Sequence, residues 1–169
     1  SSDLAGYGPL LMLLVTSPTV RDALVHGIRF QQLTHLTGEM SFKQAGHRIA
    51  LCYRPSNLQD QLGQLVAQAE ISGTYKFIQD LYKMMGLSVP EVRIELPFPK
   101  PEELKQLQLY HDYYGHQVQF NADQAAFWFD EAVLNVKIPS ADEMTFKLYE
   151  KKCIAELERL REDEKTPSL

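Results

Sequence analysis

Cysteine is scarce in this chain, which contains only Cys52 and Cys153 among its 169 residues. Small domains held by disulfides carry many more cysteines, and two so far apart in the sequence are typical of free thiols in a reducing compartment. The sequence also has no C-x-x-C and no H-E-x-x-H motif, so it lacks the usual ligand spacing of a zinc site. We predict a cytoplasmic protein with no metal site.

Long apolar runs and excess positive charge are missing as well. No apolar run reaches the roughly 18 residues that a membrane-spanning helix needs, and the run at residues 9–15 lacks the basic segment that precedes a signal-peptide core. Lysine and arginine number 17 against 22 acidic residues, which gives a formal net charge of −5. Surfaces that bind nucleic acid are basic. We expect no membrane contact and no direct DNA contact from these residues.

Motifs that perform catalysis or bind cofactors are also lacking. No serine lies in a G-x-S-x-G turn, and Gly6-Tyr7-Gly8 has neither the third glycine nor the preceding strand of a dinucleotide-binding loop. His111 and His116 are five residues apart, whereas two ligands on one helical face need an i, i+4 spacing. We assign no catalytic residue and no cofactor.

What the sequence does contain is an ordinary globular composition, with 44% apolar and 23% charged residues. These values are typical of a folded domain, and a chain of this length forms one domain or two small ones. An apolar stretch begins almost at the first residue, so we expect a domain excised from a longer protein.

Helices and a hairpin are predicted in the first half of the chain. Ser17-Pro18 is typical of an N-cap followed by proline at the first helical position, and Gly46 suits a hairpin turn. Gly73 in the longest helix marks a kink or a close helix approach. The predicted elements are a helix at residues 10–15, a helix at 19–36, strands at 39–43 and 48–54, and a long helix from Ser56 or Asn57 to Met85.

The segment from residue 92 to 142 predicts a strand, a helix and two further strands. Val92, Ile94 and Leu96 alternate with charged residues, and the prolines that follow end the strand. The helix after Pro101 ends where Gly115 provides a left-handed C-cap. Strands near residues 118–120 and 127–129 complete the unit.

The last helix begins at a predicted capping box, Ser140-x-x-Glu143, and carries a narrow apolar seam. The seam residues recur at steps of three and four, as in a coiled coil: Phe146, Tyr149, Cys153, Leu157 and Leu160. The seam either packs on the chain's own core or pairs with a second copy in a homodimer. We assign it to dimerisation.

These elements together predict an α+β fold. We expect about five mainly antiparallel strands in one sheet, with packed helices and a long amphipathic C-terminal helix. The strand–helix–strand segment adds one parallel pair if it crosses over in the sheet.

Aromatic residues are numerous and either fill the core or line a ligand cavity with a few polar groups. The aromatic residues considered for a cavity are Tyr53, Tyr75, Tyr82, Tyr110, Tyr113, Tyr114, Phe127, Trp128 and Phe129. Those predicted to bind ligand, with their polar partners, are Phe30, His35, Tyr53, Arg93, Glu95 and Trp128. If helices cover only one face of the sheet, Arg93 and Glu95 project from the other face.

The order of several short motifs resembles the N-terminal effector-binding half of AraC/XylS-type bacterial transcription regulators, in the subgroup related to regulators of ornithine utilisation. The resemblance covers roughly residues 5–160, and each motif alone is weak. The matching motifs are Gly6-Tyr7, Thr16-Ser17-Pro18-Thr19, Asp22-Ala23-Leu24, Val92-x-Ile94, Tyr110, Tyr114-Gly115, Val118, Phe120, Leu134, Ile138-Pro139 and Ala141-Asp142.

The chain departs from this family at two points. The family often has a histidine at the end of the strand before the proline turn, and here that position is Leu96. The upstream helical segment and the C-terminal pair of helix-turn-helix motifs have no counterpart in these residues.

The resemblance implies a sensor that binds a small-molecule effector, forms a homodimer and reaches DNA only through a domain absent from this chain. Residues 1–139 would be the effector-binding domain, and residues 140–169 the dimerisation or connector helix with a frayed tail. Two alternatives stay open: a small enzyme with an aromatic pocket, and a pure protein-interaction module.

Overall fold

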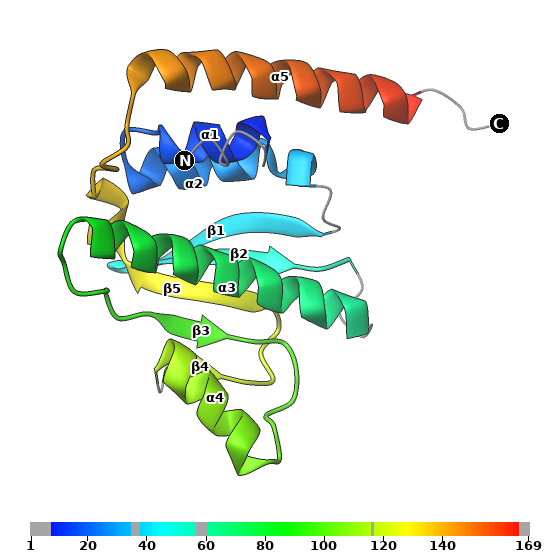
Figure 1. The fold of residues 1–169 in the computed structure, drawn as a ribbon. Coiled ribbons are helices and arrows are strands. Elements are labelled where there is room, and N and C mark those ends of the chain that lie inside the picture. Colours follow the sequence, from blue (N-terminus) through cyan, green and yellow to red (C-terminus); the bar gives the residue numbers. More distant parts are fainter. Residues whose placement is uncertain (1–7, 35–37, 57–60, 116, 166–169) are drawn as a thin grey trace. The chain divides into compact units, whose positions relative to one another are not determined.

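The structure, a computed structural model, describes residues 8–34, 38–56, 61–115 and 117–165 (Figure 1). The chain divides into two compact units. The terminal unit combines residues 1–36 with 134–169, and the sheet unit contains residues 37–133. The predicted boundary at residue 139 divides an expected effector-binding domain from an expected dimerisation helix. It was not drawn from contacts, and it stays a prediction.

The terminal unit is helical. It contains α1 (Pro9–Val15), α2 (Val20–Arg29), the 3-10 helix η2 (Gln31–Thr34) and α5 (Glu143–Lys165). The segment before α5 returns to the start of α2, where the Val20 N–H donates to Val136 O at 3.0 Å and the Ile138 N–H donates to Pro18 O at 3.0 Å. These bonds join the two ends of the chain within one unit.

Two predicted N-caps are wrong by two residues each. Thr19, not Ser17, caps α2 through a capping box with Asp22, while the Ser17 hydroxyl donates to Leu13 O at 2.8 Å. Asp142, not Ser140, accepts from the Thr145 N–H at 2.9 Å at the start of α5. Both predictions failed because each serine hydroxyl donates to a backbone carbonyl of α1 instead. The Ser140 hydroxyl donates to Val15 O.

The predicted helix at residues 19–36 is shorter than expected. The α-helix ends at Arg29, and Phe30, which is fully buried, forms its C-cap before the chain continues as η2. The reason is packing, since the chain must turn at Phe30 to place this ring in the core of the terminal unit.

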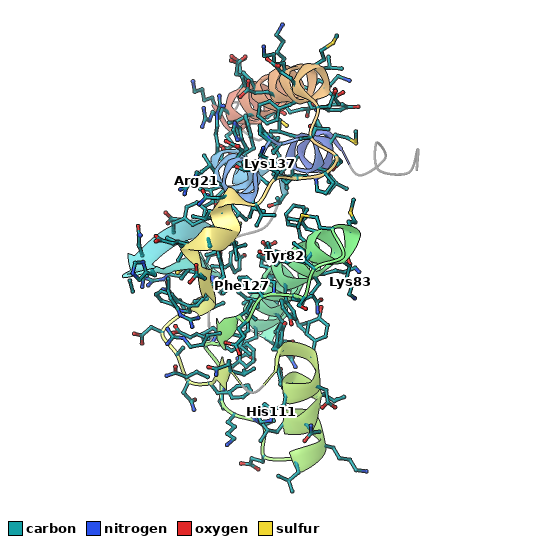
Figure 2. The ribbon with its side chains drawn as sticks, turned by 90° about the vertical axis from the view of Figure 1, so that its left-hand side faces the viewer. Arg21, Tyr82, Lys83, His111, Phe127 and Lys137 are labelled. Atoms are coloured by element: carbon teal, nitrogen blue, oxygen red, sulfur yellow. The ribbon has the colours of Figure 1, made fainter. Side chains whose placement is uncertain are left out.

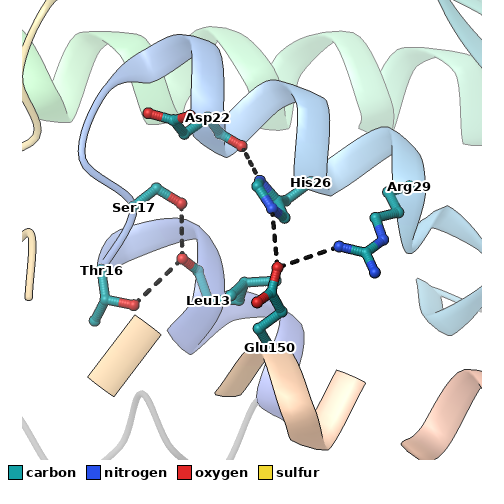
Figure 3. Close-up of polar contacts among 7 residues, drawn as sticks. All are labelled: Leu13, Thr16, Ser17, Asp22, His26, Arg29 and Glu150. Atoms are coloured by element: carbon teal, nitrogen blue, oxygen red, sulfur yellow. Dashed lines mark hydrogen bonds and ion pairs between the residues drawn. The ribbon is translucent and has the colours of Figure 1, made fainter. Parts of the chain in front are cut away.

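The core of the terminal unit holds α5 against the first helices. Leu13, Phe30, Cys153 and Leu157 form one buried cluster. Beside it, Glu150 of α5 lies 3.4 Å from His26 Nε2 and 3.2 Å from Arg29 Nη1 (Figure 3). The His26 ring also donates from Nδ1 to Asp22 O at 2.7 Å. A buried apolar contact and a partly exposed ionic one therefore fix α5 on this unit.

The sheet unit contains a five-stranded sheet within the described residues, in the order β1-β2-β5-β3-β4. The strands are β1 (Glu39–Ala45), β2 (Arg48–Arg54), β3 (Arg93–Glu95), β4 (Val118–Gln119) and β5 (Ala125–Asp130). Three pairings are antiparallel, and β3–β4 is parallel across the helical crossover. The predicted α+β fold with mainly antiparallel strands is confirmed.

Both helices of the sheet unit lie on the same face of the sheet (Figures 1 and 2). They are α3 (Gln61–Met84) and α4 (Leu104–Tyr114). Tyr75 of α3 packs on Phe127 of β5, with ring centroids 5.9 Å apart. The aromatic face of α3 therefore covers the middle of the sheet.

The long helix α3 differs from its prediction at one position. Gly73 is exposed, and a Cβ atom at this position would have no neighbour within 4 Å, so the predicted close helix approach is wrong. The helix continues through Gly73 without a break in its assignment from Gln61 to Met84. Its predicted start at Ser56 or Asn57 adjoins residues 57–60, which lie outside the described residues.

Positive backbone φ angles support two predicted turns. Gly46 has φ +61 between β1 and β2, and Gly115 has φ +81 at the end of α4. Side chains rarely adopt these angles, so glycine is favoured at both turns. Within the described residues, no helix is long and apolar enough to span a membrane.

Candidate functional site

A cavity of about 480 Å³ opens between α3, α4 and the turn before α4. This volume lies within the range of about 300–1,000 Å³ that small-molecule pockets occupy. Its lining is aromatic and uncharged: Gln68, Ser72, Pro101, Gln106, Leu109, Tyr110, Tyr113 and Tyr114. We call it the tyrosine pocket.

Helical periodicity brings these side chains to one place. Gln68 and Ser72 are i, i+4 neighbours on α3, and Gln106, Tyr110 and Tyr113 recur at steps of four and three on α4. Residues at such spacing share one helical face. Two polar–aromatic stripes therefore meet across the gap between the two helices.

The tyrosine pocket is held by contacts on both of its sides. Gln68 donates from Nε2 to the Tyr110 hydroxyl at 3.2 Å, which joins α3 to α4. The Tyr110 ring meets Phe120 edge-on, with centroids 5.2 Å apart. Because its hydroxyl and its ring are both engaged, Tyr110 has a defined position at the pocket wall.

Aromatic contacts continue from the pocket into the core of the sheet unit. The rings of Tyr113 and Tyr114 lie 4.7 Å apart, and Tyr75 lies 5.6 Å from the first and 5.5 Å from the second. Tyr75 in turn packs on Phe127, which is fully buried. Tyr75 is therefore the ring that connects the pocket tyrosines to strand β5.

Two of the pocket tyrosines, Tyr110 and Tyr114, are neutral hydrogen-bonding groups. Burial raises the pKa of Tyr114 well above its ordinary value, and neighbouring tyrosines raise it further, while a hydrogen bond with Ser72 opposes the shift. Burial also raises the pKa of Tyr110. The Tyr110 and Tyr114 hydroxyls therefore stay protonated at physiological pH, and each can donate and accept a hydrogen bond. Such a lining suits an uncharged ligand with an apolar or aromatic body.

Three of the predicted ligand-binding residues come together elsewhere, on the sheet face that α3 and α4 leave open. Arg93 pairs with Trp128 in the strand register, and its guanidinium carbon lies 4.9 Å from the indole centroid. Arg93 Nη2 lies 3.3 Å from Glu95 Oε1. We call these three residues the Trp–Arg cluster.

The other three predicted ligand-binding residues lie apart from this cluster. Tyr53 belongs to β2, where it pairs with Ala125 and faces the opposite side of the sheet from Cys52 and Ala126. Phe30 is part of the core of the terminal unit. His35 lies outside the described residues.

The five seam residues predicted for dimerisation all belong to α5. Cys153 and Leu157 are buried against Leu13 and Phe30 of the same chain, and Phe146 and Tyr149 pack partly against that cluster. Leu160 is half-buried. The chain thus uses much of the seam internally, and the assignment to dimerisation stays a prediction.

The residues of the tyrosine pocket were only partly predictable from the sequence. Tyr110, Tyr113 and Tyr114 were candidate cavity residues but were not among the six predicted to bind ligand, and the polar residues of the lining were not predicted at all. The feature of the sequence that could have indicated them is spacing: Gln68 and Ser72 are four residues apart on α3, and Gln106 and Tyr110 are four residues apart on α4. The spacing does not show that these two helix faces lie opposite each other, because that depends on how α3 and α4 pack.

A metal centre finds no support in the part of the chain that the structure describes. There, no group of three histidine, cysteine or acidic side chains could hold a metal ion.

Comparison with known proteins gives a family match and a structural match. Residues 1–138 match the family model of the arabinose-binding domain of AraC transcription regulators, N-terminal. The fold is similar to the crystal structure of the transcriptional regulator CdpR from Pseudomonas aeruginosa, with a TM-score of 0.69 and 20% identity. The match covers 86% of this chain and 46% of that one, so the chain spans less than half the length of CdpR. No curated protein sequence matches.

Proposed function

This chain belongs to the family of N-terminal arabinose-binding domains of AraC transcription regulators, and on that premise we propose that it senses a small effector for such a regulator. The DNA-binding part of the regulator would lie outside these residues. The net charge of −5 agrees with this division of labour, because DNA-binding surfaces are basic.

The tyrosine pocket is the observation that carries this proposal. Its volume suits a metabolite, and its lining offers three phenol rings with hydroxyl and amide groups but no charged side chain. The effector that fits it best is uncharged, with an apolar or aromatic body and one or two hydrogen-bonding groups.

A route for the signal follows from the contacts of the pocket. An effector that moves Tyr113 or Tyr114 changes the packing of Tyr75 on Phe127. Strand β5, which carries Phe127, continues directly into the 3-10 helix η3 (Glu131–Asn135), and the chain then leads to α5. Effector binding would shift the population of α5 positions, as a ligand does when it binds one of two states better.

We further propose that a second copy of the chain binds through α5. The seam itself is largely used within the chain, but Met144 and Leu148 on the same helix are 83% and 51% exposed. Two apolar side chains at i, i+4 spacing form a small stripe that a twin helix can cover.

A thermal-shift screen against a metabolite library tests the sensing proposal. A ligand of the native state raises the melting temperature by an amount set by its concentration relative to Kd. We expect the hits to bind Tyr110→Phe about threefold to tenfold more weakly, which is the loss of one hydrogen bond. Tyr149→Phe, the same change on α5, is the matched control.

A second variant separates binding in the tyrosine pocket from binding elsewhere. Leu109 is 68% exposed at the pocket edge, so Leu109→Trp should fold normally and extend an indole over the cavity. We expect it to abolish the thermal shift produced by the hits. Hits that stabilise Leu109→Trp and Tyr110→Phe as well as they stabilise the parent chain would rule out the tyrosine pocket as the effector site.

A further inference from the structure

Two buried N–H donors of the Trp–Arg cluster have no hydrogen-bond partner among the described residues. They are Nε of Arg93 and Nε1 of Trp128. The guanidinium lies over the indole at 4.9 Å, so the two donors belong to one compact patch. Leaving a buried donor unpaired costs free energy, and buried polar groups in native proteins are nearly always satisfied. The patch therefore has the character of a site for a hydrogen-bond acceptor.

The ion pair of Arg93 does not use these donors. Glu95 Oε1 lies 3.3 Å from Nη2, the nitrogen that shares an edge with Nε, and leaves the Nε–H itself without a partner. The pair holds the arginine side chain in place, and the stacking on Trp128 fixes its plane. The site is thus preorganised, which lowers the entropic cost of binding.

The floor and the wall of this site come from the sheet itself. Ala50, Cys52 and Ala126 form a buried cluster on the same face, and Trp128 packs against it. A cavity of about 140 Å³ adjoins the arginine. Its lining is mostly polar: Arg48, Glu91, Val92, Arg93 and Gln117.

We propose that the Trp–Arg cluster binds the carboxylate of a small organic acid. A planar carboxylate has two acceptor oxygens that match a guanidinium edge and a neighbouring indole N–H. A phosphate fits less well, because its second negative charge would face Glu91 and Glu95. This site lies on the open face of the sheet, apart from the tyrosine pocket on the α3 face, and the proposal does not depend on an effector in that pocket.

Trp128 is the only tryptophan in the chain, so its fluorescence reports on this site alone. The experiment titrates the full chain with acetate, propionate and hexanoate, and separately with inorganic phosphate and chloride, at constant ionic strength. We expect a saturable change in Trp128 emission with at least one of the carboxylates, and none with phosphate or chloride. Equal responses to all five anions, or no response to any of them, would overturn the proposal.

Variants show whether the response comes from the proposed donors. Arg93→Gln removes the charge and Nε, and we expect binding at least about tenfold weaker, the effect of losing a charge-assisted hydrogen bond. Arg21→Gln is the matched control, an exposed arginine of the terminal unit that should bind as the parent does. Trp128→Phe, followed by calorimetry, keeps an aromatic ring and removes the N–H. Unchanged affinity in both Arg93→Gln and Trp128→Phe would refute the site.

Discussion

Burial controls the reactivity of the two cysteines. Cys52 and Cys153 are 1% and 0% exposed, and they contact small or apolar neighbours. Burial raises the pKa of the Cys52 thiol, and it raises that of Cys153 to about 11. Because the thiolate is the reactive form, both side chains act as small core residues rather than as redox groups.

Thiol reactivity provides a test at the residue scale. In the native protein at pH 8, we expect Ellman's reagent to react with neither cysteine over several minutes. Both should react at once after unfolding in guanidinium chloride, since unfolding restores access and an ordinary pKa. The variants Cys52→Ala and Cys153→Ala assign any signal to one thiol. Rapid labelling of Cys153 in the folded protein would contradict its place in the core.

At the scale of elements, α5 is held by its apolar contacts more than by its ion pairs. Leu157 is 7% exposed in the core cluster. The side chains of the ion pair between Arg29 of α2 and Glu150 of α5 are 48% and 30% exposed. Partly exposed pairs contribute about 0–1 kcal/mol, while burial of a leucine contributes several times more. The core therefore supplies most of the stability of α5.

Three variants on α5 test this ranking. We expect Leu157→Ala to lower the free energy of unfolding by roughly 3 kcal/mol, because it leaves a cavity in the core. Glu150→Gln should cost less than about 1 kcal/mol. Leu148→Ala, the same truncation at an exposed position, should change stability by less than about 0.5 kcal/mol. Urea denaturation provides all three values, and an equal loss for Glu150→Gln and Leu157→Ala would reverse the ranking.

Local patterns predicted the elements well, because each pattern depends on one segment only. The alternation around Ile94 correctly placed Arg93 and Glu95 on the face opposite α3, and the order of helices and strands was confirmed. The caps at Ser17 and Ser140 were wrong, because carbonyls close in sequence or far from it accepted those hydroxyls.

Contacts between segments that are distant in the sequence could not be predicted from local patterns. The insertion of β5 between β2 and β3 depends on pairings across more than one loop, and no periodicity encodes them. The tyrosine pocket was missed for the same reason, since Gln68 and Tyr110 are joined by a contact between residues that are 42 positions apart. The Trp–Arg cluster was partly predicted, but its unpaired N–H donors are visible only in three dimensions.

At the scale of the whole molecule, the two ends of the chain form one unit and the middle forms the other. The unit that contains α5 is thus built from the residues that precede and follow the sheet unit in the sequence. The effector site that we propose lies in the middle of the sequence, and α5 lies near its end. The exposed stripe of Met144 and Leu148 is where we propose a second copy binds.

Self-association tests that proposal. We expect Leu148→Asp to weaken the dimer in sedimentation experiments without lowering the melting temperature, because position 148 is exposed within one chain. Leu157→Asp is unsuitable for this purpose, since it places a charge in the core and unfolds the terminal unit. A parent chain that is monomeric at high concentration, or a Leu148→Asp dimer of unchanged strength, would exclude α5 as the contact.

The tyrosine pocket is where we propose that the effector binds, and NMR of the tyrosine rings tests this most directly. The chain would be labelled with carbon-13 in its tyrosine rings and titrated with a ligand found in the thermal-shift screen. We expect the resonances of Tyr110, Tyr113 and Tyr114 to shift with one common affinity, and those of Tyr149 to stay in place. Saturation of the protein with ligand, with no change in the three pocket tyrosines, would exclude this pocket as the effector site.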